Sequence, residues 1–185
     1  MRSVFVLFSM LLLFSCEDEV TVKPAAMLRL EYPVPSYTQS ATNCYYSFQK
    51  NTLSNLETKQ RCGMNLEYPF MNATVYLTYQ AVKGNNLDSL LYDAQKLTYE
   101  HNKKAQAIFE QPRADSINKV YGMFYAIDGN AATQSQFYVT DSINHFVTGS
   151  LYFNAKPNYD SIYPAVMYLR NDIRHIMETI TWENN

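Results

Sequence analysis

The chain has 185 residues, a formal net charge of −2, and 47% hydrophobic residues. That length suits one ordinary domain with a real core, and the small charge gives no global field for nucleic acid, so no nucleic-acid partner is expected. Aromatic residues are abundant, with 16 tyrosines and 10 phenylalanines. Tyrosine suits half-buried strands and interfaces, because its ring is apolar and its hydroxyl is polar.

The N-terminus has the order of a bacterial lipoprotein signal. Arg2 precedes an almost wholly apolar run from Val4 to Phe14, and Ser15 and Cys16 close it. The run falls short of the ~20 apolar residues of a membrane-spanning helix. A plain signal peptide with an accidental cysteine is the other alternative. The pattern predicts cleavage before Cys16 and acylation of its sulfur with diacylglycerol (palmitate chains), which anchors the protein to a membrane.

These features divide the chain into a signal peptide (residues 1–15), a tether (16–26) and a single α+β domain (27–185). The acidic residues Glu17, Asp18 and Glu19 resemble signals that send lipoproteins to the cell surface, and they equally resemble a solvated tether. We expect a lipid-anchored protein of the cell envelope that faces the periplasm, at the outer or inner membrane. Exposure at the cell surface is the alternative.

Four strands are expected in the first half of the domain. Their β-branched and aromatic residues, bounded by proline and turn residues, place them at 27–32, 44–48, 64–68 and 73–79. Once Cys16 is lipidated, Cys44 and Cys62 remain, and two thiols in an oxidising compartment predict one disulfide. A metal or redox pair is the alternative. It is disfavoured because no histidine lies nearby and no C-x-x-C occurs.

The second half alternates between helix and strand patterns. Apolar residues from Leu87 to Ile108 recur at helical spacing and predict a helix over 87–109 that ends at Pro112. Strands are expected at 119–127, 133–140 and 145–153, and a second amphipathic helix from about 157 to 180. Tight turns favour antiparallel pairing. The predicted fold is α+β, a twisted antiparallel sheet covered by two long helices. It resembles the PsbP/Mog1 kind of α/β/α sandwich, an analogy that implies no activity.

Residue types that carry catalysis or bind metals are sparse. His101 is expected to be a satisfied, partly buried side chain, and His145 has no ligand type beside it in sequence. His175 shares a helix face with Asp172, as in an ordinary surface ion pair. No catalytic or metal-binding motif occurs, and five glycines leave little room for a phosphate-binding loop. We therefore expect a non-enzymatic protein with no cofactor and no metal.

The last predicted helix also carries two arginines. Arg170 and Arg174 lie four residues apart, with Asp172 and Glu178 near them. A solvated face of mixed charge is the favoured interpretation. A cationic patch for a partner or a lipid headgroup is the alternative.

The dipeptide Asp-Ser followed by Leu or Ile recurs at predicted element boundaries. Asp and Ser favour turns and helix starts, which accounts for the recurrence. The motif also resembles the Asp-Ser/Thr-apolar acceptor for O-linked glycans in exported proteins of gliding bacteria, so glycosylation of at least one site is the alternative. The candidate acceptors are Ser89, Ser116, Ser142 and Ser161.

Strings along nearly the whole mature chain resemble the gliding-motility lipoprotein D (GldD) family. They lie at 87–91 (LDSLL), 93–101 (DAQKLTYEH), 120–125 (VYGMFY), 135–142 (SQFYVTDS), 145–146, 148–153 (TGSLYF), 157–161 (PNYDS) and 178–182. Residues 36–62 carry the match less well. The resemblance implies a part in bacterial gliding and a link to type IX protein secretion. The family has no established catalytic residues, so only Cys16 carries over as a site.

Two functions from different classes follow. The first is a non-enzymatic lipoprotein that supports assembly or stability of a gliding and type IX secretion complex, through the membrane and protein partners in that complex. Its partner face is expected on the aromatic surface and the polar strand at 133–136. The second is a periplasmic module that binds a small ligand or lipid, which predicts an apolar pocket between a helix and the sheet.

Overall fold

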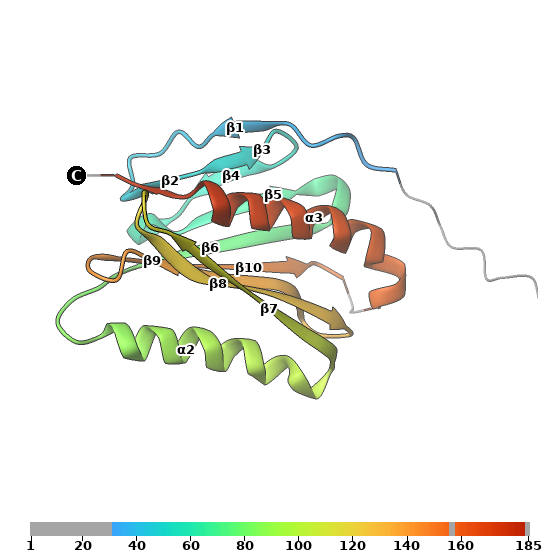
Figure 1. Cartoon of the computed structure of the whole chain (residues 1–185). Helices are drawn as coiled ribbons and strands as arrows, with labels where there is room; N and C mark the ends of the chain where they lie inside the picture. Colours follow the sequence, from blue (N-terminus) through green and yellow to red (C-terminus); the bar gives the residue numbers. More distant parts are fainter. Residues whose placement is uncertain (1–30, 156–157, 184–185) are drawn as a thin grey trace, which may run out of the picture.

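A seven-stranded antiparallel sheet forms the centre of the computed structural model, which describes residues 31–155 and 158–183 (Figure 1). The strand order is β4-β5-β6-β10-β9-β8-β7. The strands, in chain order, are β4 (Asn55–Thr58), β5 (Met64–Tyr68), β6 (Ala73–Ala81), β7 (Ala105–Asp115), β8 (Val120–Gly129), β9 (Thr133–Thr140) and β10 (His145–Phe153).

Two short strand pairs lie beside this sheet. One joins β1 (Tyr37–Gln39) to β3 (Gln49–Asn51), and the other joins β2 (Tyr46–Ser47) to β11 (Thr181–Trp182). The second pair brings the C-terminal segment back to the early part of the chain. Short 3-10 turns occur at Gln60–Cys62 (η2), Pro69–Met71 (η3) and Glu100–Lys103 (η4).

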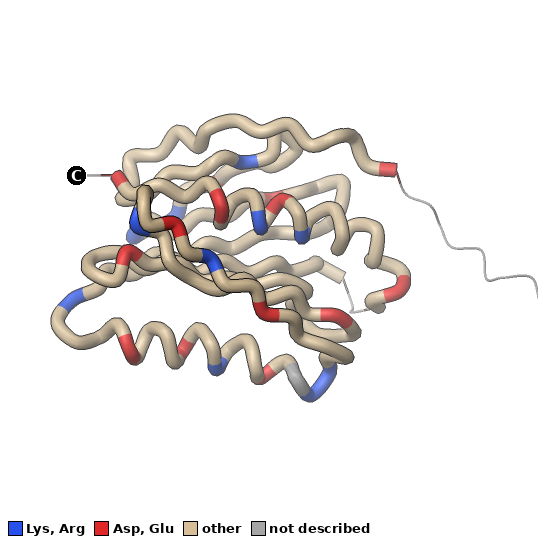
Figure 2. Tube along the Cα trace, viewed as in Figure 1, with Lys and Arg blue, Asp and Glu red and all other residues tan. Residues whose placement is uncertain are grey.

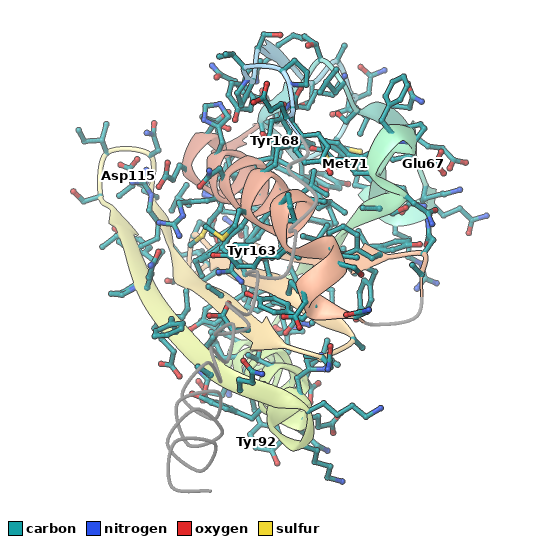
Figure 3. The ribbon with its side chains drawn as sticks, turned by 90° about the vertical axis from the view of Figure 1, so that its right-hand side faces the viewer. Glu67, Met71, Tyr92, Asp115, Tyr163 and Tyr168 are labelled. Carbon is teal, nitrogen blue, oxygen red and sulfur yellow. A yellow bond between two sulfur atoms is a disulfide. The ribbon has the colours of Figure 1, made fainter. Side chains whose placement is uncertain are left out.

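The two α-helices lie on opposite faces of the sheet (Figure 1). On one face, α3 (Tyr159–Thr179) packs against β8, β9 and β10, and the β1–β3 pair lies beside it. Figure 3 shows Tyr168 of α3 directed toward that pair, with Tyr92 on the outer side of the other helix. On the second face, α2 (Leu87–Tyr99) buries Leu90 against Tyr125, Tyr138 and Phe146.

The strand predictions are confirmed in the meander and the adjoining strands. The bounds of β5, β9 and β10 are those expected from the sequence, and β6 extends two residues beyond its prediction. Hydrophobic and aromatic residues alternate toward the two helices, which is the pattern of a sheet covered on both faces. The expected strand at 44–48 shrinks to β2, and residues 31 and 32 of the first expected strand are not in a strand. Its other residues lie outside the described part.

The prediction of a sheet covered by two long helices is wrong. The predicted helix at 87–109 ends at Tyr99, after 13 residues, and the chain then forms the 11-residue strand β7. Pro112, which was expected to stop the helix, lies inside strand β7. A proline is tolerated there because β7 is the edge of the sheet and needs no donor on its outer side. The sheet, with one long and one short helix, therefore dominates the fold.

Candidate functional site

A groove opens at the end of the sheet where β6 extends beyond β5. Its volume is about 790 Å³. It is lined by Tyr45, Gln60, Arg61, Gly63, Thr78, Tyr79, Gln80, Ala81 and Lys83. A second hollow of about 670 Å³ shares Tyr45, Tyr79 and Lys83 and reaches His145 and Glu183. The two hollows therefore form one candidate binding surface, which we call the end groove.

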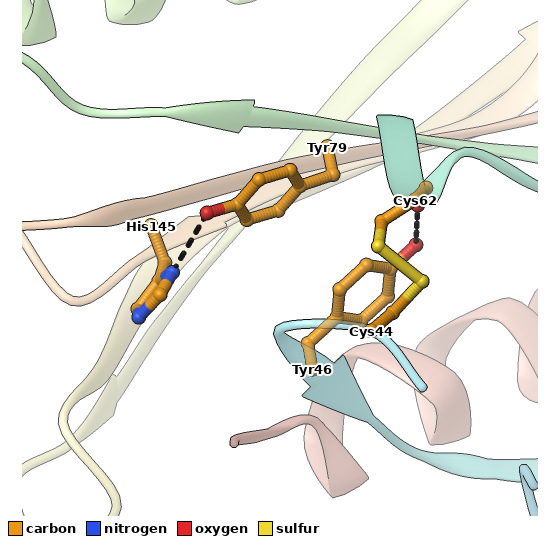
Figure 4. Close-up of a disulfide and its surroundings, with 5 residues drawn as sticks. All are labelled: Cys44, Tyr46, Cys62, Tyr79 and His145. Atoms are coloured by element: carbon orange, nitrogen blue, oxygen red, sulfur yellow. Dashed lines mark hydrogen bonds between the residues drawn. A yellow bond between two sulfur atoms is a disulfide. The ribbon is translucent and has the colours of Figure 1, made fainter. Parts of the chain in front are cut away.

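Three aromatic rings, those of Tyr45, Tyr79 and His145, line the end groove, and Trp182 supports one of them from behind. Tyr45 stacks on Tyr79 with ring centroids 5.1 Å apart, and His145 stacks on Trp182 at 5.2 Å. The Tyr79 hydroxyl and the His145 Nδ1 are 2.9 Å apart, within hydrogen-bond distance (Figure 4). Burial, with smaller contributions from Tyr45 and Asp141, raises the pKa of Tyr79. Stacked rings with a polar edge suit recognition of a ligand, because they offer apolar area and hydrogen-bond groups together.

The Cys44–Cys62 disulfide lies next to residues that line the end groove (Figure 4). The two Cα atoms are 5.5 Å apart, and the half-cystines adjoin Tyr45 and the groove residues Arg61 and Gly63. The Tyr46 hydroxyl donates to the carbonyl oxygen of Cys62 at 3.1 Å. The predicted disulfide is therefore present, and it fixes the η2 turn against β2.

Replacing both Cys44 and Cys62 with serine should lower the free energy of unfolding by about 3 kcal/mol, because the unfolded chain regains the entropy of a closed loop. Denaturant unfolding of the oxidised protein and the double variant measures this difference. Wild-type protein unfolded in a reductant is the control, and it should match the variant. Equal stability of the oxidised and the double-serine proteins would contradict the role assigned to this bond.

A second polar cluster is buried between α3 and the β1–β3 pair. Asp172 is only 1% exposed, and its carboxylate accepts hydrogen bonds from the Tyr37 hydroxyl at 2.8 Å and the Asn51 amide at 2.7 Å. Burial raises the pKa of Asp172 above its usual range, although the bonds from Tyr37 and Asn51 oppose that shift. On the same helix, His175 stacks on Tyr37, with centroids 3.7 Å apart. This cluster fastens the first described segment to α3.

We expected a solvated face of mixed charge on α3. That prediction is wrong for the central residues of the helix. Besides Asp172, Arg170 is only 9% exposed and donates to Asp128 at 2.8 Å and to the carbonyl oxygen of Ile127 at 3.2 Å. Arg174 lies over the ring of Phe124. Burial alone raises the pKa of Asp128, but hydrogen bonds from Tyr159 and Arg170 outweigh it and lower that pKa. Arg170 and Asp172 therefore bond inside the protein and are not available to a lipid headgroup, whereas Arg174 is half-buried.

The prediction that the polar strand at 133–136 forms a partner face is wrong as well. Residues Thr133 to Gln136 belong to β9, the central strand of the meander, and all four are buried. Their side chains bond inside the protein: Thr133 donates to Leu151 at 2.6 Å, and Gln136 accepts from Thr98 at 2.8 Å. Helices cover both faces of this strand, so its polar residues serve the interior.

The candidate acceptor serines are all exposed. Ser89 lies in the first turn of α2, and Ser161 in that of α3. Ser116 and Ser142 lie in the two loops with the sequence Asp-Ser-Ile-Asn, where Asp115 and Asp141 accept bonds from the following backbone N–H groups. Their exposure is compatible with glycosylation, which stays a prediction. Cys16 lies outside the described residues, so its lipidation also stays a prediction.

The histidines lie in three separate places. His101 is half-buried in η4, and burial lowers its pKa. His145 is in the end groove, and His175 is beside the Asp172 cluster. Within residues 31–155 and 158–183, no group of three or more His, Cys, Asp or Glu side chains is arranged to hold a metal ion. The end groove was not foreseen from the sequence, although two of the many tyrosines line it and the single tryptophan stacks on its His145.

The comparison with protein families defines the class: envelope lipoproteins that take part in gliding motility. A family model described as "Gliding motility lipoprotein GldD" matches residues 17–182, nearly the whole chain, and the chain belongs to this family. No curated protein and no solved structure matches it. In the part of the chain that the structure describes, no helix is long and apolar enough to cross a membrane.

Proposed function

We propose that this protein is a non-enzymatic lipoprotein that supports assembly or stability of the gliding apparatus and its type IX secretion machinery. The family match over residues 17–182 is the observation that carries this proposal. The lipid on Cys16 and the tether at 16–26 hold the domain at 27–185 on the membrane. The domain faces the periplasm.

The position of the end groove supports a role in binding partners. The first described residues lie at one end of the sheet, and the groove lies at the other (Figure 1). An anchor attached through the N-terminal segment therefore leaves the groove open to the surrounding compartment. Charges of both signs are interspersed along α2 and α3, so the helices offer no strongly charged face (Figure 2).

A Cys16→Ala variant should abolish lipidation, release the protein into the soluble fraction and stop gliding, because the acyl chains hold it to the membrane. The matched control is Ser15→Ala, which keeps a small residue before the cysteine. Fractionation, intact mass and colony spreading measure the effect. A Cys16→Ala strain that glides normally would overturn the anchoring role.

Crosslinking of whole envelopes tests the role in assembly. Pull-down of the wild-type lipoprotein should recover gliding or secretion components, and deletion of the gene should lower their abundance. Recovery of none, with their abundance unchanged, would contradict a role in assembly or stability. Protease treatment of intact cells tests orientation, since a periplasm-facing domain is protected.

The alternative of a small-ligand or lipid-binding module has less support. It predicts an apolar pocket between a helix and the sheet. The hollow found between α2 and β9 among the described residues has a volume of about 20 Å³ and is lined by polar Thr98 and Gln136 as well as Tyr125. This is room for about one water molecule, so it does not accommodate a lipid chain.

A further inference from the structure

One side of β6 has no neighbouring strand along its last residues. β5 pairs with β6 only as far as Leu77, whereas β10 follows the other side of β6 to Ala81. Among the described residues, no strand takes the place of β5 beside Thr78 to Ala81. The end groove runs along this same segment.

The hydrogen-bond pattern shows which backbone groups face the groove. The Val82 N–H donates to the carbonyl oxygen of Asn144 at 2.8 Å, so the backbone N–H of Val82 faces the β10 side of the strand. Successive residues of a strand point to opposite sides, so the N–H and C=O groups of Tyr79 and Ala81 point toward the groove. The carbonyl of Ala81 accepts from the Asn86 side chain at 3.2 Å, which agrees with that direction.

This free segment differs from the outer edges of the sheet. The edge strand β7 contains Pro112 and carries Glu110 and Arg113, and the opposite edge strand, β4, has only four residues. Proline, charged side chains and short length protect edges from unwanted pairing. The segment from Thr78 to Ala81 contains none of these features. The end groove, lined by Gln60, Arg61 and Lys83, runs along it, and the Asn86 side chain bonds the Ala81 carbonyl.

The walls of the groove also define the charge of its occupant. Arg61 and Lys83 line the hollow that runs along Thr78 to Ala81, and no acidic residue lines that hollow, whereas Glu183 lies in the second hollow of the groove. Tyr45, which is 42% exposed, offers a ring on one side. The lining therefore complements an acidic chain with apolar side chains at alternate positions.

We propose that the end groove binds an extended acidic peptide segment of a partner protein, which adds to β6 as a strand in line with β5. The N–H and C=O of Tyr79 and the N–H of Ala81 bond the peptide backbone, Tyr45 packs against an apolar side chain, and Arg61 and Lys83 attract its carboxylates. Strand addition of this kind takes affinity from the backbone and specificity from alternate side chains. This inference rests on the proposed role in assembly. Its test measures peptide binding and not gliding, so peptide binding and the role in gliding can fail separately.

The test uses the full lipidated protein in detergent micelles and the peptide Glu-Val-Glu-Val-Glu-Val-NH2 with a fluorescein group on its N-terminus. Fluorescence anisotropy at low salt should show saturable binding, and hydrogen exchange should slow in the segment from Thr78 to Val82. The same peptide with alternate N-methyl groups should bind at least about tenfold more weakly, because it cannot pair along β6. Lys83→Glu should weaken binding about threefold.

Lys96→Glu is the matched control, because Lys96 is also an exposed lysine and lies on α2, outside the lining of the groove. It should leave the affinity unchanged. Equal binding of the N-methylated and unmodified peptides would overturn strand addition. Equal weakening by Lys83→Glu and Lys96→Glu would overturn the groove as the site, and so would no binding of the unmodified peptide at millimolar concentration.

Discussion

An Asp172→Ala variant should lose about 2–3 kcal/mol of unfolding free energy at neutral pH, because it removes the acceptor of two buried hydrogen bonds. The Tyr37 hydroxyl loses its partner, and the Asn51 Nδ2 keeps only its bond to the Tyr168 hydroxyl. The loss falls where the N-terminal segment joins α3. Circular dichroism during denaturant unfolding measures it. Asp93→Asn, on the exposed face of α2, is the control and should change stability by less than about 0.5 kcal/mol.

The pH dependence distinguishes the charge of Asp172 from its hydrogen bonds. Its folded-state pKa is raised, mainly by burial, so the folded protein takes up this proton before the unfolded chain does. As the pH falls from 7 through the folded-state pKa, the wild type should therefore gain stability relative to Asp172→Asn, and the gain is complete below the unfolded-state pKa. A stability difference between the two proteins that is independent of pH would contradict a buried carboxylate.

The helix predicted at 87–109 shows where sequence periodicity was ambiguous. Leu87 to Leu97 do form a helical stripe, but Ala105 and Ile108 continue that spacing inside strand β7. A register shift between Ala105 and Ala107 disturbs the two-residue alternation of the strand. The apolar spacing of this irregular edge strand therefore resembled that of a helix, because a β-bulge interrupts the two-residue alternation that identifies strands. β9 and β10 were predicted to the residue, since the register shift in their pairing falls near the end of β10, between Leu151 and Tyr152.

The sequence predicted a site only where the residue type alone indicates the chemistry, as cysteines indicate a disulfide. The count of cysteines was enough to predict the Cys44–Cys62 disulfide. The end groove instead depends on β11 pairing with β2, which brings Trp182 beside His145. A two-residue strand has no detectable periodicity, so this approach of distant segments could not be read from the sequence. The burial of Asp172 was missed for the same reason, because its donors Tyr37 and Asn51 come from another part of the chain.

A Gly122→Ala variant should lose about 3 kcal/mol of unfolding free energy, because one added methyl group forces two central strands apart. Gly122 lies in β8 and pairs with Val139 of β9. A Cβ atom at this position would overlap the backbone carbonyl of Tyr138. Backbone cannot rotate away as a side chain can, so the strands must shift. Thermal unfolding of the variant, or its yield of folded protein, measures the effect.

Two other glycines show whether that close approach sets the cost. At Gly149, the added Cβ would overlap the ring of Phe137, so Gly149→Ala should be partly rescued by Phe137→Leu. At Gly84, with a φ of +60° and no atom within 4 Å, an alanine should lose only about 1 kcal/mol, from the left-handed backbone alone. If Gly122→Ala lost no more than Gly84→Ala, the meander would have room to adjust at β8. The contact between Gly122 and Tyr138 would then not be a constraint on the sheet that supports the end groove.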